Sequence, residues 1–408
     1  MELLSPAGNL EKLGAAYRFG ADAAYAGVES FSLRARADNF NLDDADTVRR
    51  LKGKKRLYCT LNIYFHGEDL RRLEERLEAI TAFPFDAFIV SDPGVTPLLR
   101  RYAPGAELHL STQANCVNAE AAKFYRDVGF SRIVLGRELS LAEIGEIRAS
   151  VPDVELEAFV HGAMCLAYSG RCFLSAWMAD RSANRGSCAH SCRWKYRPAD
   201  LLYYIEEEKR PGEFFPVIEG DHFTSILSSK DIRMIDHLAE LRDAGVDVLK
   251  IEGRMKSAYY TAIVTRAYRK QLDHVLGGNP SAEEAAAFVA ELDTVSRRES
   301  STGFYFGSED IEVPTEQEYT RDYVFIGTLG EAHAPGVFEL LLKNRLEHGM
   351  HLEIVSPHVP RLEDSAFELL DNEGNTVAAL NHRDGGFIRP SVPAEPGDIL
   401  RSINNPVA

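Results

Sequence analysis

The chain has no run of 18 consecutive apolar residues, which argues against a membrane-spanning helix. Its first residues, MELLSPAGNLEKLG, lack the basic stretch followed by an apolar stretch that marks a secretory signal. Basic residues are also scarce, because 46 Lys and Arg stand against 62 Asp and Glu and leave a net charge of −16. We therefore expect a cytoplasmic protein without membrane contact that repels nucleic acid except at a local basic patch.

Several catalytic and metal-binding motifs are missing as well. The sequence contains neither H-E-x-x-H nor G-x-S-x-G, so it shows no common motif that activates water or a serine for peptide hydrolysis. It also lacks the paired C-x2-C knuckles of most structural zinc sites and the C-x3-C-x2-C signature of radical SAM enzymes. These absences weigh against a conventional protease and against the commonest zinc folds.

Cysteine is rare, yet four of the six cysteines follow one another with the spacing C-x6-C-x15-C-x3-C. These four are Cys165, Cys172, Cys188 and Cys192. In a reducing compartment, clustered thiols bind metal more often than they form disulfides. Four thiolates suit a structural zinc or an iron–sulfur cluster. The spacing of six, fifteen and three residues suits a cluster held by two separate loops, which modestly favours iron–sulfur over zinc. Cys59 and Cys116 lie in apolar segments and are expected to be small buried residues.

Blocks around these cysteines resemble the signature of the family catalogued as peptidase U-32. They are EAFVHGAMC at 157–165 with SGRCFLS at 169–175, and NRGSC at 184–188 with the Cys192-Arg193 pair. The opening ELLSPAGN at 2–9 and KIEGRMK at 250–256 match further landmarks of the family. The stretches at 203–213 and 301–307 are most similar to the branch of the family that acts on tRNA. The similarity covers essentially the whole chain.

Despite the family name, this resemblance implies oxygen-independent hydroxylation of a tRNA wobble uridine, of a ribosomal RNA cytidine or of the ubiquinone ring. It also implies that the four cysteines hold a 4Fe-4S cluster and that the RNA-modifying branches need prephenate, a small dicarboxylate metabolite. We therefore expect an enzyme that converts the wobble uridine in the anticodon loop of tRNA to 5-hydroxyuridine. A U-32 peptidase and a non-catalytic iron–sulfur scaffold subunit remain alternatives, and the sequence does not indicate an electron-donor protein.

The pattern of residues 1–278 predicts a (β/α)8 fold, a TIM-like barrel of the α/β class. Apolar, β-rich runs alternate with amphipathic helical stretches, and strict alternation of eight such units indicates a closed parallel barrel. The predicted strands are 2–4, 23–26, 56–61, 87–90, 107–110, 132–135, 156–160 and 246–251. The predicted helices include 10–19, 69–79, 119–128, 141–149 and 231–244. A doubly wound open sheet is the alternative.

The cysteine-rich segment at about 165–228 is expected to be an insertion after the seventh strand. From Cys165 to Pro198 it carries six basic residues and one acidic residue, so 6 − 1 gives a local charge of +5. Both tryptophans of the chain, Trp177 and Trp194, also lie there. Basic groups interleaved with aromatic rings suit a single-stranded RNA loop, and they suit the shielding of a metal cluster equally well.

The chain changes character after the barrel. Residues 279–321 are predicted to be a helical and linker segment that follows the stop signal Gly277-Gly278-Asn279-Pro280. Residues 322–408 are predicted to form a small β-barrel domain, because short alternating runs are separated by turns. Its expected strands are 323–328, 337–342, 351–355, 366–370 and 387–390. Six basic and 13 acidic residues give it a charge of 6 − 13 = −7, so protein contact or simple packing is at least as plausible a role as RNA binding.

The barrel hypothesis also predicts where the chemistry takes place, because active sites of such barrels lie on loops that leave the carboxyl ends of the strands. The expected substrate-binding residues are Arg34, Arg36, Asn62, Asp92, Gln113 and Arg137. The expected catalytic residues are His161, Glu252 and Arg254. Guanidinium forks bind carboxylates, so Arg34 and Arg36 are expected to hold the dicarboxylate. His161 is expected to move protons near the cysteines, and Glu252 with Arg254 has a structural ion pair as its alternative role.

Overall fold

The computed structural model describes most of the chain in two compact units. The described residues are 1–28, 31–32, 39–165, 167–172, 181, 188, 204–206, 214–216, 218–220, 223–225, 230–307, 322–382 and 384–403. The first unit comprises Met1–Leu13, Asp22–Met255 and Arg298–Glu318, and the second comprises Gly14–Ala21, Lys256–Arg297 and Tyr319–Ala408. Five residues on which predictions rest lie outside the described residues, namely Arg34, Arg36, Trp177, Cys192 and Trp194.

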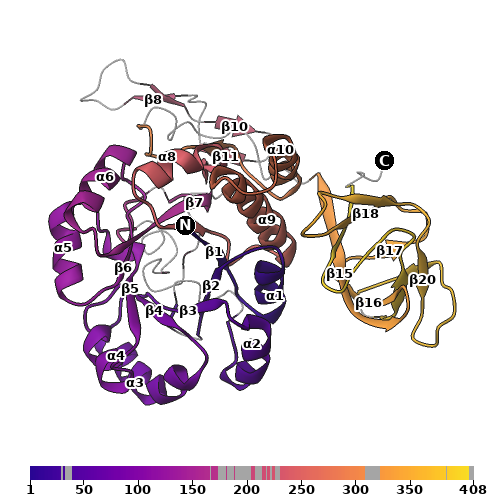
Figure 1. Cartoon of the computed structure of the whole chain (residues 1–408), viewed down its shortest axis with the longest axis horizontal. Helices are drawn as coiled ribbons and strands as arrows, with labels where there is room; N and C mark the ends of the chain where they lie inside the picture. Colours follow the sequence, from indigo (N-terminus) through magenta and orange to yellow (C-terminus); the bar gives the residue numbers. More distant parts are fainter. Residues whose placement is uncertain are drawn as a thin grey trace. The chain divides into compact units, whose positions relative to one another are not determined.

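Eight parallel strands close into a barrel in the first unit, which confirms the predicted fold (Figure 1). They are β1 (Glu2–Pro6), β2 (Ala23–Gly27), β3 (Arg56–Leu61), β4 (Ala87–Val90), β5 (Glu107–Leu110), β6 (Arg132–Val134), β7 (Glu155–Ala163) and β13 (Val248–Ile251). Each strand pairs in parallel with the next one along the chain, and β13 pairs with both β7 and β1 to complete the ring. The open-sheet alternative is therefore wrong.

Helices connect the strands and surround the barrel (Figure 1). They are α1 (Leu10–Arg18), α2 (Ala45–Lys52), α3 (Gly67–Ala82), α4 (Val95–Tyr102), α5 (Ala119–Asp127), α6 (Leu141–Ser150) and α8 (Leu238–Asp243), with the 3-10 turns η1 (Leu42–Asp44), η2 (Thr112–Ala114) and η5 (Ile235–His237). The start of α6 shows how the sequence sets such boundaries, because Ser140 and Glu143 form a reciprocal capping box. All five residues of β2 are buried, as expected for a parallel strand covered on both sides.

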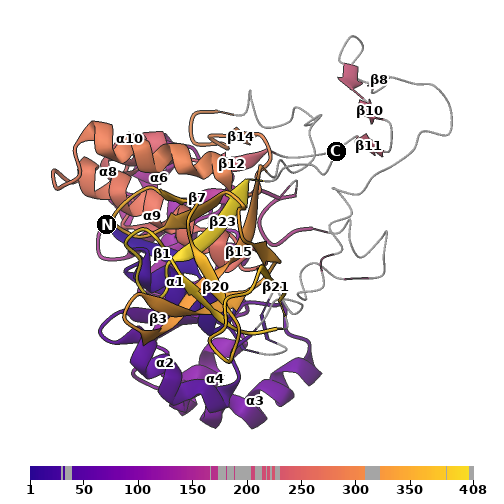
Figure 2. The same ribbon diagram turned by 90° about the vertical axis from the view of Figure 1, so that its right-hand side faces the viewer.

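The strand β7 extends beyond the barrel, and this extension corrects one prediction. Its last residues pair antiparallel with β12 (Asp231–Arg233), which in turn pairs with β14 (Ser300–Ser301), as Figure 2 shows. Residues 231–233 were predicted to begin a helix, which was wrong, because they form this strand before η5 and α8 begin. The protruding end of β7 offers unpaired backbone groups, and β12 satisfies them. Between β7 and β12 the described residues include two antiparallel pairs, β8 (Tyr204–Glu206) with β9 (Phe214–Pro216) and β10 (Ile218–Gly220) with β11 (Phe223–Ser225).

The second unit combines helices with a curled antiparallel sheet. Its helices are α9 (Ala258–Val275) and α10 (Ala282–Ala290), followed by the 3-10 turn η6 (Glu291–Thr294). The seven strands of the sheet lie in the order β19 (Leu362–Asp364), β18 (Leu352–Val355), β23 (Ile399–Ile403), β15 (Tyr323–Ala334), β16 (Val337–Leu342), β22 (Phe387–Arg389) and β20 (Glu368–Leu370). A separate pair joins β17 (Leu346–Glu347) to β21 (Ala379–Leu380). Among the described helices, none is both long and apolar enough to cross a membrane.

A buried ion network ties this sheet to the helices of the same unit. Arg401 on β23 is fully buried and lies 2.6 Å from a carboxylate oxygen of Glu353 on β18 and 2.6 Å from one of Glu291 on η6. The same guanidinium donates to the hydroxyls of Tyr259 at 3.1 Å and Thr294 at 2.8 Å. Arg266 and Arg361 approach Glu291 only at 3.6 Å, so Arg401 makes the shorter contacts to both buried carboxylates, and the pairing between β23, β18 and η6 is sensitive to its loss.

Replacing Arg401 should destabilise the second unit. We expect Arg401→Met to lower the free energy of unfolding by about 3–5 kcal/mol, because it removes the closest cation from two buried carboxylates. The loss should be measured by guanidinium denaturation, with hydrogen exchange in β18 and β23 as the local readout. The matched control is Arg389→Met, which removes an exposed ion pair with Glu368 and should change the free energy by less than about 1 kcal/mol. Equal effects of the two substitutions would contradict the role assigned to Arg401.

Candidate active site

The interior of the barrel contains a column of buried charges. At the amino-terminal end, Arg132 is fully buried and lies 2.8 Å from Glu2 and 2.8 Å from Glu155. Higher in the barrel, Arg132 approaches Glu157 at 3.4 Å, and Lys250 donates to the other oxygen of Glu157 at 2.5 Å. Glu157 is fully buried and Lys250 is only 4% exposed. The column thus joins four of the eight barrel strands by charge as well as by backbone hydrogen bonds.

The surroundings of Glu157 and Lys250 shift the pKa values of both side chains. Although burial alone would raise the pKa of the Glu157 carboxyl, the charges of Lys250 and Arg132 hold it below its ordinary value. Burial also lowers the pKa of the Lys250 ammonium, and Glu157 opposes that effect. The ammonium further faces two aromatic rings, with Tyr25 at 4.3 Å and Phe159 at 5.5 Å from the nitrogen to the ring centre. Lys250 therefore places a cation just below the carboxyl ends of the strands.

Arg254 adds a second buried cation to this end of the barrel. Its guanidinium is bonded to the hydroxyl of Ser32, to Thr60 Oγ1 at 3.3 Å and to Asn39 Oδ1 at 2.9 Å, and the residue is 3% exposed. Gly27 makes room for this arrangement, because a Cβ atom there would lie 2.6 Å from the Asn39 oxygen. Glu252, for which an ion pair with Arg254 is the alternative role, lies beside Tyr25, with 3.5 Å between the Tyr25 hydroxyl and a carboxylate oxygen.

The loop that carries Cys165 and Cys172 is fastened to the same end of the barrel. The Ser169 amide donates to Glu138 Oε1 at 2.6 Å, and the Tyr64 hydroxyl lies 2.6 Å from the Gly170 carbonyl oxygen and 3.1 Å from that of Gln113. Gly170 has a φ of +75°, and a Cβ atom there would lie 2.1 Å from the Gln113 carbonyl oxygen. The loops after β3, β5 and β6 therefore fix the position of the cysteine loop.

Arg137 connects this loop to the barrel interior. Its Nη1 lies 3.7 Å from Cys165 Sγ, and its guanidinium carbon stacks 4.0 Å from the centre of the Phe159 ring. Phe159 also faces Lys250, so two cations lie against the same ring. The main-chain carbonyl of Phe159 accepts a bond from the buried Tyr305 hydroxyl at 2.7 Å. Tyr305 belongs to the 301–307 stretch, which therefore supports β7 directly beneath the site.

The remaining predicted site residues have different surroundings. Asp92 uses its carboxylate oxygens to accept the amides of Phe65 at 3.0 Å and Gly94 at 2.8 Å, which shapes the loops after β3 and β4. The main-chain amide of Asn62 donates to the main-chain carbonyl of Phe31, and the main-chain amide of Glu252 donates to that of His161. His161 is half-buried and lies where β7 pairs with β12.

The structure brings Gln113, Arg137, Glu252 and Arg254 to the mouth of the barrel but adds residues that sequence reasoning missed. These are Tyr25, Tyr64, Glu157, Phe159, Ser169 and Lys250. One signal was available, namely a lysine within the otherwise apolar strand VLKI and glutamates within ELEAFV. Charged residues inside a fully buried strand have to be paired, so both runs indicated an interior ion pair.

The six cysteines fall into two groups. Cys59 and Cys116 are fully buried, as predicted, and burial raises the pKa of the Cys116 thiol to about 11. In contrast, Cys165 is exposed and Cys172 and Cys188 are partly exposed. Reduced and accessible sulfur ligands on a fixed loop fit an iron–sulfur cluster or another thiophilic metal. The fourth predicted ligand, Cys192, lies outside the described residues.

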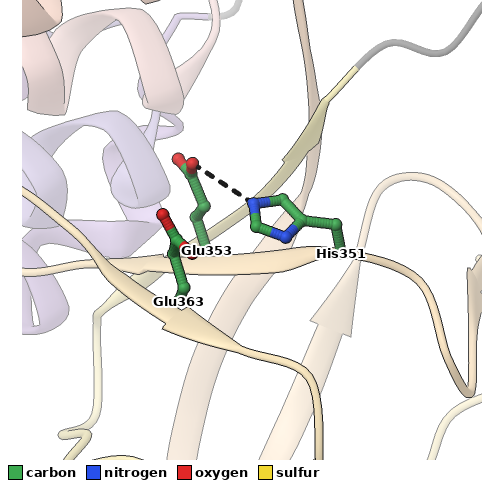
Figure 3. A group of neighbouring side chains, drawn as sticks. All are labelled: His351, Glu353 and Glu363. Carbon is green, nitrogen blue, oxygen red and sulfur yellow. Dashed lines mark ion pairs between the residues drawn. The ribbon is translucent and has the colours of Figure 1, made fainter.

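A second group of metal-type ligands lies on the C-terminal sheet. The side chains of His351, Glu353 and Glu363 point toward one another there (Figure 3). However, Glu353 already pairs with Arg401 at 2.6 Å and is 2% exposed, while His351 approaches its other oxygen at 3.5 Å. A metal ion would have to share this carboxylate with a buried guanidinium, which is unfavourable. We therefore assign the group to the ion network around Arg401.

Gly170 provides a test of how the cysteine loop is held. We expect Gly170→Ala to displace residues 167–172 while leaving the barrel folded, because the substituted residue would need a φ of +75° and would collide with Gln113. Hydrogen exchange should rise in this loop and stay unchanged in β3 and β5. Gly105→Ala is the matched control, since no atom lies within 4 Å of a Cβ there. Unchanged exchange in the loop would show that other contacts hold it.

Comparison with known proteins agrees with this architecture. Residues 8–314 match peptidase family U32, and residues 321–401 match the peptidase family U32 C-terminal domain. The tRNA hydroxylation protein P of Escherichia coli is 35% identical over 92% of this chain and 92% of its own length. The tRNA hydroxylation protein P1 of Bacillus subtilis is 37% identical over 93% and 89%, and a collagenase of Porphyromonas gingivalis is 34% identical over 75% and 73%. The chain therefore belongs to peptidase family U32.

Proposed function

We propose that this chain is a tRNA-hydroxylating enzyme and that its target is the wobble uridine of the anticodon loop, which it converts to 5-hydroxyuridine. The observation that carries the proposal is the placement of an accessible thiol loop at the carboxyl-terminal mouth of a barrel, the position at which such barrels build their active sites. The names of two relatives that match nearly the whole chain, both tRNA hydroxylation proteins, support the same reaction.

Cys165, Cys172, Cys188 and Cys192 would hold a 4Fe-4S cluster in this proposal. When bound, such a cluster supplies one-electron transfer without molecular oxygen. The protein's own part is to fix the sulfur ligands, and the contacts of Ser169, Gly170 and Tyr64 do so for the first half of the set. Cys165 and Cys172 lie in the part of the insertion that directly follows β7, and Cys188 and Cys192 lie further along it, so both parts would supply ligands.

The cations near the mouth favour a small anionic co-substrate such as the dicarboxylate prephenate. Lys250 and Arg254 are both buried within the same end of the barrel, and Lys12 donates to the Arg254 carbonyl at 3.3 Å. Buried positive charge attracts carboxylates strongly because little water screens it. Arg34 and Arg36 would grip the carboxylates, and the His161 imidazole would take up or release a proton beside Cys165.

Peptide hydrolysis is the alternative that the collagenase relative suggests. No protease motif accompanies that name in this chain. A peptidase assay on the purified full chain, run on the same preparation as the RNA assay, separates the two activities. Cleavage that survives complete removal of iron would favour the peptidase.

The central prediction concerns one cysteine ligand. Cys188→Ser should abolish both the cluster and 5-hydroxyuridine, because a serine oxygen is a poor ligand for iron in such a cluster. Anaerobic preparations should contain about four irons and four sulfides per chain in the wild type, and far less in the variant. The activity is measured as the 5-hydroxyuridine content of tRNA from a deletion strain that carries either the wild-type gene or the Cys188→Ser gene.

The matched control is Cys116→Ala, which removes a thiol that is fully buried in the barrel unit. It should keep the iron, the sulfide and the modified nucleoside. Normal levels of 5-hydroxyuridine in cells that carry only Cys188→Ser would refute the proposed mechanism. If the wild-type chain contained one zinc and no sulfide, the cysteines would form a structural zinc site, and the proposed redox chemistry would lose its basis.

A further inference from the structure

The contact between Arg137 and Cys165 carries an inference beyond the binding of the cluster itself. We propose that Arg137 sets the reduction potential of the cluster that Cys165 helps to bind. The inference rests on the cluster of the proposed function but not on the identity of the RNA target. Sequence reasoning assigned Arg137 to substrate binding, whereas the structure directs its Nη1 at the Cys165 sulfur, 3.7 Å away.

The guanidinium is held in place from several directions. It stacks on Phe159 at 4.0 Å, and the Arg137 amide donates to Ser169 Oγ at 3.4 Å, on the loop between the two cysteines. The residue before it is Gly136, where a Cβ atom would lie 2.6 Å from Val117 and 2.7 Å from Glu138. Only a planar cation can both stack on a ring and direct an N–H group at the sulfur, which favours arginine over lysine here.

The support of this guanidinium extends into the barrel. Phe159 lies on β7, and Cys165 follows the end of that strand by two residues, so the rigid strand holds the ring and begins the loop that carries the sulfur. The ring also faces Lys250, which Glu157 holds at 2.5 Å. Lys250 therefore limits movement of the ring away from Arg137. The sulfur, the ring and the guanidinium thus keep a fixed geometry, as an electrostatic effect on a cluster requires.

The direction of the effect follows from charge. Reduction adds one electron to the cluster and makes it more negative, so a nearby cation and an N–H donor to a ligand sulfur stabilise the reduced form more than the oxidised form. Arg137 therefore raises the reduction potential, and removing its charge should make the potential more negative.

The test is a redox titration of the anaerobically purified full chain, followed by electron paramagnetic resonance. We expect Arg137→Met to weaken the affinity of the cluster for an electron roughly tenfold, which corresponds to about 59 mV for one electron. Arg137→Gln keeps an N–H donor but loses the charge, so its potential should lie between those of the wild type and Arg137→Met. The matched control is Arg171→Met, which removes an exposed arginine of the cysteine loop and should shift the potential much less.

Each outcome decides one question. Wild-type iron content with an unchanged potential in both Arg137 variants would overturn the inference while leaving the proposed function intact. An increased KM for the substrate with an unchanged potential would show that Arg137 binds substrate, as the sequence predicted, and would also overturn the inference. A wild-type chain without iron and sulfide would refute the cluster and this inference together. A shifted potential in a chain that does not modify tRNA would support the role of Arg137 and refute the proposed reaction instead.

Discussion

The fully buried carboxylate of Glu157 is the constraint on which the barrel and its mouth depend. A carboxylate without water is tolerated only when cations surround it, and Arg132 and Lys250 supply them from β6 and β13. Arg132 in turn needs Glu2 on β1 and Glu155 on β7. Because β7, β13 and β1 are neighbours where the ring closes, a shift in their register would separate these charges. The ion column thus specifies closure in a way that apolar packing alone does not.

The same column determines what the mouth of the barrel can do. Lys250 is fixed from below by Glu157 and presents its cation to Phe159, whose other neighbour is Arg137. A chain of contacts therefore runs from the amino-terminal end of the barrel to Cys165, and each step is a charge pair, a ring contact or a hydrogen bond. The thiol itself remains exposed on a loop. This division places the Cys165 sulfur on the surface and the charged groups around it in the rigid interior.

Periodicity in the sequence was enough to locate all eight barrel strands, because parallel strands covered on both sides appear as short apolar runs. It failed where neighbours far along the chain decide the structure. The Lys250–Glu157 pair spans 93 residues, so the charged residue in each apolar run indicates a buried ion pair but does not identify its partner. The strand β12 forms because β7 protrudes beyond the barrel and pairs with it. The strand β23 looks polar in sequence because it contains Arg401, but this arginine is paired inside the second unit. The clustered cysteines were visible, but the contact of Arg137 with one of them was not.

Polar residues at strand ends are also a weaker guide to chemistry than their number suggests. Both carboxylate oxygens of Asp92 accept hydrogen bonds from main-chain amides, and the Arg254 guanidinium is bonded to three side chains within the barrel. Both positions would look catalytic in a list of charged strand ends, yet each also holds a loop in place. Cys165 and Lys250 differ, because the Cys165 thiol is exposed and the Lys250 ammonium is paired with the Glu157 carboxylate beneath the mouth of the barrel. In the proposed function Cys165 would help to bind a cluster above this buried cation, an arrangement that would suit redox chemistry on an anionic substrate better than peptide hydrolysis.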